Sequence, residues 1–223
     1  MADAGALTTW LVLAAFALVP LLLLTATSFA KIAVVLSLLR NALGVPDVPS
    51  GALITAFAAL LSVFVMAPVA RESAARAAPF AARIDLAAPL AGASRVALFA
   101  TIDAAVPPLA AFLERNAGAA ERALFAELGR RTRPGQQAAA LAPDSLLVLL
   151  PAFLITELAE AFAVGLLVLL PFVVLDLVIG SILLSLGMSA LTPGTVALPF
   201  KLLLFVLVDG FSVLSRALVT GYQ

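Results

Sequence analysis

Long apolar stretches, broken by prolines and single charges, dominate the pattern of this chain. Leu7 to Leu24 is uncharged and about long enough to cross a hydrocarbon core of ~30 Å. A cleaved signal peptide is the competing interpretation, but no cationic residues precede the segment, and we expect a retained helix. Gly51 to Val69 is a second apolar stretch, closed by Pro68 and Arg71, and Gly44 to Pro49 before it has the composition of a turn.

The C-terminal part of the chain begins with an apolar stretch of about two crossings, Leu146 to Ala190. Pro151 and Pro171 are expected to divide this stretch, with Val164 to Leu186 as its membrane-spanning segment. Val196 to Val219 is the last apolar helix. Together with the N-terminal stretches, the pattern predicts four membrane spans.

The region between these parts, Arg71 to Asp144, is polar and holds nine arginines and seven acidic residues. Four prolines are expected to break it into short helices: Pro79, Pro89, Pro107 and Pro108. Arg130 to Gln137 has the composition of a flexible basic loop, for which no nucleic-acid role is expected. The sequence thus predicts a hydrophobic helix pair at residues 1–70, a polar, periplasmic helical domain at residues 71–145, and a hydrophobic hairpin region at residues 146–223.

The amino-acid composition indicates the class of protein to which this pattern belongs. Of the 223 residues, 64% are hydrophobic and 12% are charged, about half the charged share of a soluble domain. A water-soluble chain this apolar has too few polar groups to cover its surface, whereas lipid accepts apolar side chains directly. We therefore predict an all-α membrane protein with about four hydrophobic helices and a small helical extramembrane domain between the second and third.

Two residue types are missing, and their absence narrows the chemistry. The chain has no Cys and no His, which removes disulfides, thiolate nucleophiles, the usual zinc ligands and any Ser-His-Asp relay. The formal net charge is zero, so no global field favours nucleic acid or acidic partners. We expect neither a metal nor a cofactor.

Basic residues near short loops predict the orientation of the spans. Lys31 and Arg40 belong to the first loop region, and Lys201 follows the turn around Pro193. These positions fall on one side of the membrane, which should be cytoplasmic. The arginine-rich region then lies on the other side, which is compatible with the rule because loops longer than ~60 residues largely escape it.

Several charges lie within or beside the apolar helices, where an ionised group costs at least ~2.5–3.5 kcal/mol unless it is paired or hydrated. Asp176 and Lys201 have opposite signs on consecutive hydrophobic helices, so we predict an ion pair, within one chain or between copies. A proton relay is the alternative. Glu157 and Glu160 share one helix face at i, i+3, and a wet lumen or a subunit contact is the favoured interpretation for them.

Small residues near the end of the third predicted span indicate close helix packing. Ser181, Ser185 and Ser189 repeat every fourth position, beside Gly180, and this spacing lets helices approach closely, within one chain or between copies. Met188 follows at the tip of a predicted helical hairpin. A single Met is usually a gap filler, but this place makes a gate contact a reasonable hypothesis.

Two sequence blocks are more specific than hydropathy. The first spans Ala26 to Val69 and contains TSF-x-K, LLRNALG and VMAPV. The second contains LLPAFLITEL (149–158), LLPFVVLDLVIGSILLSLGM (169–188) and LTPGTVALPFKLLLFVLVDGF (191–211). Both blocks resemble the FliP/SctR family of flagellar and injectisome export-apparatus proteins. They cover roughly half the chain at its two ends, whereas the arginine-rich middle carries no such match.

The resemblance implies a role in assembly. Family members form a ring with copies of themselves and with FliQ/SctS-type and FliR/SctT-type proteins, around the entrance pore for unfolded secreted proteins. Their nominally transmembrane helices form helical hairpins lifted partly out of the bilayer. The resemblance also implies a location in the bacterial inner membrane, with part of the complex on the periplasmic side. Family members are neither ATPases nor proteases and bind no cofactor.

The resemblance also assigns roles to individual residues. Asp176 and Lys201 match charged family positions for which an ion pair between packed helices is expected, and Glu157 matches the acidic residue of LPAF-x-x-x-E. Met188 matches the start of a methionine cluster that forms a pore gasket. Here Ser189 and Ala190 follow it, so Leu186, Leu191 or Phe residues from partners are the expected substitutes.

Alternatives within and outside the family stay open. Lys31 after Phe29 favours the injectisome branch over the flagellar branch, whose members more often carry Arg at that position. An ion-coupled transporter would use Glu157, Glu160 and Asp176, although no inverted repeat relates the two halves. An intramembrane enzyme is the third hypothesis, and only carboxylate pairs are available for it.

Overall fold

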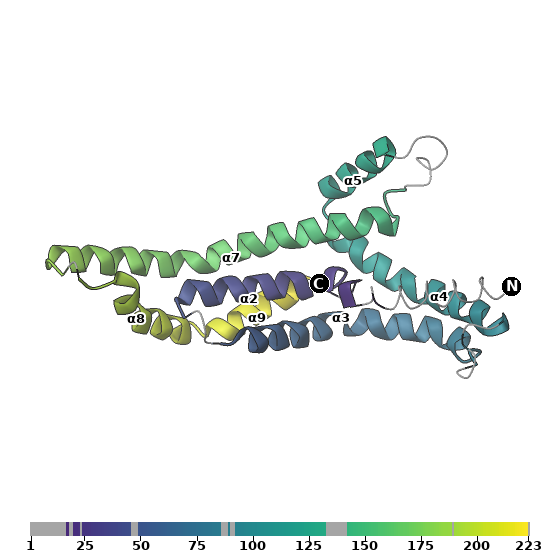
Figure 1. Ribbon diagram of the computed structural model, residues 1–223, viewed down its shortest axis with the longest axis horizontal. Helices are drawn as coiled ribbons and strands as arrows, with labels where there is room; N and C mark the ends of the chain where they lie inside the picture. Colours follow the sequence, from purple (N-terminus) through teal and green to yellow (C-terminus); the bar gives the residue numbers. More distant parts are fainter. Residues whose placement is uncertain are drawn as a thin grey trace. The chain divides into compact units, whose positions relative to one another are not determined.

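The computed structural model describes residues 17, 20–22, 24–45, 49–85, 89, 92–132, 142–188 and 190–222, and within these residues the secondary structure is helical, without strands. The elements in chain order are α2 (Phe29–Leu43), α3 (Gly51–Ala81), α4 (Gly92–Asn116), α5 (Ala119–Thr132), α7 (Leu146–Ser185), α8 (Pro193–Leu207) and α9 (Gly210–Thr220) (Figure 1). Most of the predicted helix at 7–24, and the part of the predicted basic loop after residue 132, lie outside the described residues.

Pro89 lies in the connection between α3 and α4, as expected, but the other prolines do not divide the helices. α3 continues through Pro68 and Pro79, and α4 continues through the pair Pro107 and Pro108. α7 is one helix of 40 residues that includes Pro151 and Pro171. A proline in a helix interior removes one backbone hydrogen bond and costs ~3 kcal/mol in water. In apolar surroundings no water competes for the remaining backbone groups, so a helix with one missing bond persists.

Three helices are long and apolar enough to cross a membrane, namely α3, α4 and α7, counted over the described residues. α8 and α9 together form a possible fourth span that bends by 59°. α3 and α7 contain two of the segments predicted to span. The sequence does not predict a span in α4, because the number of charged residues in the region from Arg71 to Asp144 is high. In the helix, several of those charges lie near the ends, Arg95 at one and Glu114 and Arg115 at the other.

The chain divides into two compact units. The α2 unit comprises residues 29–65 and 157–223, and the α4 unit comprises residues 1–28 and 66–156. The long helices α3 and α7 each contribute one part to either unit. The domain boundary predicted after residue 70 therefore falls inside α3, five residues beyond the change of unit.

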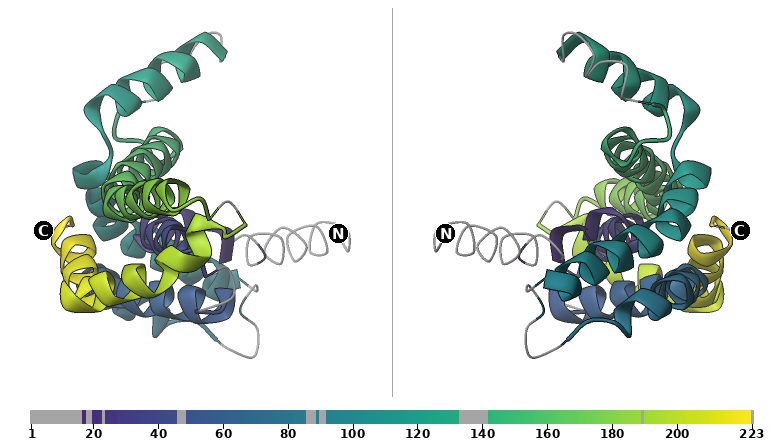
Figure 2. Two further views of the ribbon diagram at one scale, coloured as in Figure 1. Left: turned by 90° about the vertical axis from the view of Figure 1, so that its left-hand side faces the viewer. Right: turned by 90° about the vertical axis from the view of Figure 1, so that its right-hand side faces the viewer.

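The α2 unit has its core around α2. α2 carries apolar residues on most of its circumference, and the first part of α3, the second part of α7, α8 and α9 surround it (Figure 2). The buried cluster consists of Ile32, Val35, Leu36, Leu39, Ala42, Leu43, Ile54, Ala58, Ala161, Phe172, Phe205, Leu214 and Leu218. On α7, Gly165 lets Leu38 of α2 approach, since a Cβ at that glycine would meet the Leu38 side chain.

The α4 unit is held by a few specific contacts. The rings of Phe112 on α4 and Phe153 on α7 lie 5.7 Å apart. The Thr156 hydroxyl accepts a hydrogen bond of 2.9 Å from the backbone N–H of Gly118, between α4 and α5. Ser73 on α3 donates to the Ala105 carbonyl on α4 at 2.8 Å, which ties the two apolar helices together.

Candidate functional site

A buried ion pair joins α2 to α7. Lys31 lies in the first turn of α2 and is 5% exposed, and Glu157 on α7 is 1% exposed. The Lys31 Nζ lies 3.1 Å from Oε1 of Glu157 and 2.5 Å from Oε2 of Glu160, which is exposed. A charge this deeply buried is stable only with a partner, because leaving it unpaired costs several kcal/mol. These contacts therefore fix the first turn of α2 against α7.

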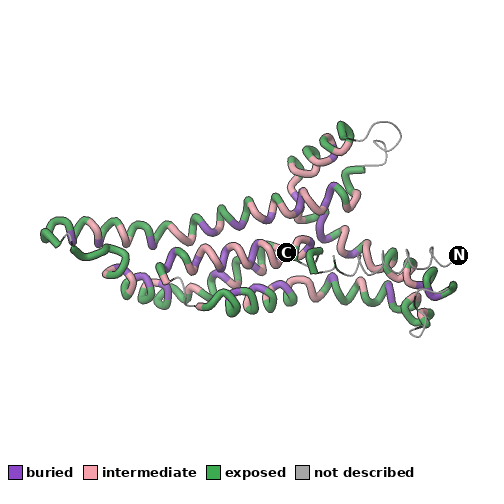
Figure 3. Tube along the Cα trace, in the orientation of Figure 1, coloured by how far each residue is buried: buried purple, intermediate pink, exposed green. Residues whose placement is uncertain are grey.

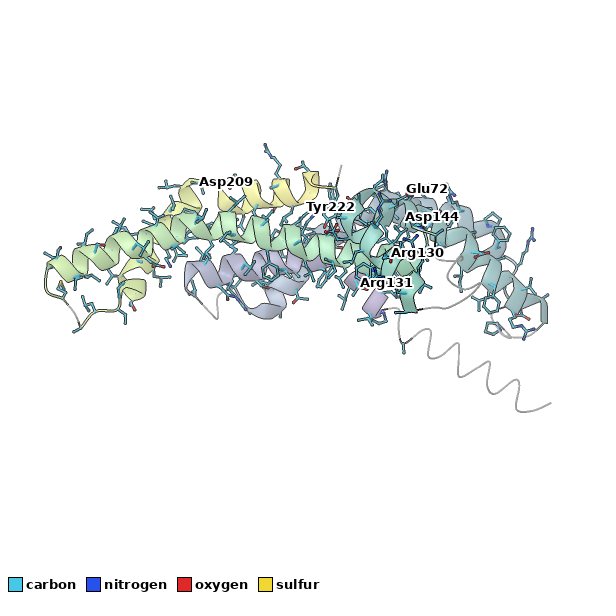
Figure 4. All side chains as sticks on the ribbon, turned by 90° about the horizontal axis from the view of Figure 1, so that it is seen from above. Glu72, Arg130, Arg131, Asp144, Asp209 and Tyr222 are labelled. Atoms are coloured by element: carbon cyan, nitrogen blue, oxygen red, sulfur yellow. The ribbon has the colours of Figure 1, made fainter. Side chains whose placement is uncertain are left out.

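Tyr222, just beyond α9, completes this cluster. Its hydroxyl donates a hydrogen bond to Oε2 of Glu157, and the Lys31 Nζ lies 4.4 Å from the centre of its ring. Burial, together with the adjacent carboxylate, raises the pKa of Tyr222 above its usual range, so the hydroxyl keeps its proton and acts as a donor. Tyr222 and Asp209 mark the two ends of α9 in Figure 4. The cluster thus anchors the C-terminal end of α9 to α2 and α7.

A second ion pair lies at the opposite end of α2. Lys201 on α8 is 5% exposed, and its Nζ lies 2.7 Å from Oδ2 of Asp176 on α7. The same Nζ donates to the Ala42 carbonyl at 3.2 Å. The last carbonyls of a helix have no partner within it and carry partial negative charge, so a cation is favourable there. Lys201 therefore connects α2, α7 and α8 through one ammonium group.

The two clusters hold α2 at both of its ends. The sequence predicts a pair between Asp176 and Lys201 and favours a wet lumen or a subunit contact for Glu157. The structure instead buries Glu157 against Lys31 and Tyr222. All three carboxylates of the transporter hypothesis contact a lysine ammonium group. Over the described residues, no group of three carboxylates is placed to hold a metal ion.

Two residues of the first cluster, Lys31 and Tyr222, are not predicted as site residues from the sequence, and only Lys31 carries a signal there. Lys31 was visible, because it is an isolated cation in an apolar helix, and the argument that paired Lys201 with a carboxylate applies to it equally. Tyr222 gave no such signal. It is the one tyrosine of the chain and lies after the last apolar helix. Only the tertiary fold brings it to Glu157.

The predicted gate residues lie at the tip where α7 ends. Gly187 has φ +70°, in the left-handed region, and the Met188 N–H donates to the Leu183 carbonyl at 2.9 Å, which terminates the helix. Leu186 is 66% exposed and Met188 is 43% exposed, so the single chain presents both side chains outward. Their contact with a pore stays a prediction.

The predicted packing residues behave differently from one another. Gly180 faces α8, since a Cβ there would lie 3.6 Å from Cγ of Pro193. Ser181 and Ser185 are exposed, and their hydroxyls donate to the carbonyls of Leu177 and Ile182 in their own helix. Packing of the two serines between copies stays a prediction. Ser189 lies outside the described residues.

The fold and the ion pairs define a class, an all-α membrane protein. Charges within its apolar helices bind one another inside a helical unit, and broad apolar faces remain exposed. Within that class, the chain belongs to the FliP family, whose model matches residues 12–218. The matched region includes every charged residue of the two clusters.

Relatives cover almost the whole chain. The hypersensitivity response secretion protein HrcR of Ralstonia nicotianae is 44% identical over 94% of this chain and 94% of its own length. The Yop proteins translocation protein R of Yersinia pestis is 44% identical over 95% of this chain and 94% of its own length. The flagellar biosynthetic protein FliP of Pectobacterium carotovorum is 37% identical over 96% of this chain and 78% of its own length.

Proposed function

We propose that this protein is a core subunit of the export apparatus of a bacterial type III secretion system. Several copies, together with FliQ/SctS-type and FliR/SctT-type subunits, form the entrance channel for unfolded secreted proteins in the inner membrane, with part of the complex on the periplasmic side. The observation that carries the proposal is the full-length similarity to secretion and translocation proteins, which extends through both compact units. The role is structural, without catalysis or a cofactor.

The exposed surface of α7 supports a role in assembly. In its most apolar window only 11% of the residues are buried, although the mean hydropathy of that window is 2.8. Large apolar side chains on the second part of the helix are exposed, among them Leu166, Leu167, Leu170, Val174, Leu177 and Ile182. Figure 3 shows that exposed positions recur along α7. A face of this size needs lipid or another protein against it. One helix can contact both, along different parts of its length.

Asp176 gives a second, polar indication of contacts between subunits. Its Oδ2 binds Lys201, but its Oδ1 is buried without a hydrogen-bond partner among the described residues. An unsatisfied buried acceptor costs ~1–3 kcal/mol or more, and an incoming donor from a neighbouring subunit would remove that cost. The Asp176–Lys201 pair orders the chain, and Oδ1 is the atom that a donor from a neighbouring subunit would bind in the proposed ring.

The injectisome is favoured over the flagellum as the setting. The relatives named for hypersensitivity response secretion and Yop translocation are 44% identical and nearly equal in length to this chain. The flagellar relative is 37% identical, and the match spans 78% of it. We therefore expect loss of the protein to affect secretion of virulence proteins and to leave swimming unchanged.

Deletion of the gene in its host tests the function. Secreted proteins in the culture medium are detected by immunoblotting, and motility in soft agar is scored in parallel. Loss of secretion, restored by the wild-type gene and by a control variant with the exposed Arg131→Ala change, is the expected result. Normal secretion would contradict the proposal. Normal secretion with lost motility would assign the chain to the flagellar apparatus instead.

A further inference from the structure

An apolar cavity lies beside α2 in the α2 unit. α2, the first part of α3 and Phe211 of α9 enclose a volume of about 270 Å³. Most of its wall is hydrocarbon, from residues that include Leu36, Leu39, Leu43, Leu53, Phe57 and Phe211. The volume is close to the lower end of small-ligand sites, ~300 Å³, and ligand sites characteristically combine an apolar lining with a few polar groups.

Arg40 is the charged residue of this wall. Its Nε is buried and has no hydrogen-bond partner in the described part of the chain, where it also forms no salt bridge. Its Nη1 lies beside the start of α3, since a Cβ on Gly51 would be 3.7 Å away. In the same unit, Lys31 and Lys201 both bind carboxylates. Arg40 thus carries its guanidinium charge in the wall of a hydrocarbon-lined space without a carboxylate partner in the described part of the chain.

This combination selects a ligand with an apolar chain and an anionic head. A guanidinium group binds phosphate oxygens through two parallel N–H donors, a geometry that an ammonium group does not reproduce. Three of its helices are long and apolar enough to cross a membrane, and basic pockets between membrane helices bind anionic headgroups. We propose that the cavity binds an anionic phospholipid, with its phosphate on Arg40 and one acyl chain between α2, α3 and Phe211.

The predicted membrane orientation and the apolar lining favour a lipid as the occupant. The orientation predicted from the sequence has Arg40 on the cytoplasmic side, where the bilayer surface is negative. Leu53 of α3, which is exposed, and Pro49 ahead of that helix also line the cavity. A lipid can therefore place its headgroup at Arg40 while its chain stays in apolar surroundings throughout.

Native mass spectrometry of the full chain in detergent tests this proposal. Delipidated protein is titrated with dioleoylphosphatidylglycerol, and the apparent Kd is compared between wild type and variants. Arg40→Gln should weaken binding about tenfold, the loss expected for one charge-assisted contact to phosphate. Leu53→Trp, which narrows the opening and keeps the charge, should weaken it as well. Arg216→Gln is the matched control, because it removes an equal charge from an exposed position on α9 and should change nothing.

Two comparison ligands separate the parts of the proposal. Dioleoylphosphatidylcholine should bind several-fold more weakly than the anionic lipid, and inorganic phosphate should not compete at the same concentrations. Unchanged affinity in Arg40→Gln would overturn the proposal, and so would competition by phosphate as strong as that of lipid. A changed oligomeric state in Leu53→Trp with lipid binding intact would show that the cavity receives protein instead. If Arg40→Gln does not fold, Arg40→Lys replaces it and should also lose affinity, because the two-donor geometry is gone.

Discussion

Glu157→Gln removes the one buried carboxylate that Lys31 and Tyr222 share. Lys31 and Glu157 are nearly inaccessible, and both carboxylate oxygens of Glu157 accept hydrogen bonds, one from each partner. The substitution keeps the shape of the side chain and takes away its charge. It therefore isolates the electrostatic part of the contact that holds the first turn of α2 against α7.

The size of the effect follows from burial. Breaking a buried ion pair by removing one partner costs ~3–5 kcal/mol, because the other charge is left without compensation. Glu160 still lies 2.5 Å from the Lys31 Nζ, and this exposed carboxylate compensates part of the loss. We therefore expect Glu157→Gln to lower the free energy of unfolding by about 3 kcal/mol, at the lower end of that range. Replacing both partners, as Lys31→Met with Glu157→Met, should cost less than the single change, because no buried cation is left behind.

Unfolding of the purified chain in mixed detergent micelles, titrated with sodium dodecyl sulfate and followed by circular dichroism, measures these differences. Glu127→Gln is the control, because Glu127 is an exposed carboxylate that binds Arg130 and Arg131 on the surface of α5. Its unfolding curve should coincide with that of wild type. A Glu157→Gln curve that also coincides with wild type, or a double variant less stable than the single one, would refute the buried-pair account.

Three further changes probe the α2 unit. The charge exchange Asp176→Lys with Lys201→Asp should retain more assembled complex on gel filtration than either single change, and equal loss in all three variants would exclude direct pairing. Tyr222→Phe removes one hydrogen bond to a carboxylate and should lower the free energy of unfolding by ~1.5–3 kcal/mol in the same detergent titration. An unchanged unfolding curve would show that the hydroxyl does not contribute to stability. Gly165→Val would force a branched side chain against Leu38 and should destabilise by ~1–3 kcal/mol, whereas a stable variant would mean that the two helices can separate.

The helical class and the position of the ion-paired helices were predictable because they depend on local pattern. Apolar runs long enough to span predicted the spans in α3 and α7, and the lone opposite charges predicted that Asp176 and Lys201 were candidates for pairing. The family resemblance rested on motifs at both ends of the chain, and the family model extends it to residues 12–218.

The features that the sequence did not predict depend on the solvent around the backbone and on which helices pack together. Whether Pro68 or Pro171 ends a helix is decided by the solvent around the backbone, which a residue pattern does not specify. The partner of Glu157 is decided by which helices pack together, and Tyr222 reaches it across 65 positions of sequence. The total charge of the polar region does not predict that α4 is apolar enough to span a membrane. The helix bounds are needed to recognise its apolar stretch.

Electron cryomicroscopy of the detergent-extracted complex, prepared from cells that co-express the neighbouring export-apparatus genes, tests the central claim most directly. The account predicts several copies of this chain in a closed ring with FliQ/SctS-type and FliR/SctT-type subunits, and the tip around Leu186 and Met188 at the central pore. Particles in which this chain is a monomer, or in which it occurs without those partners and without a pore, would contradict the account.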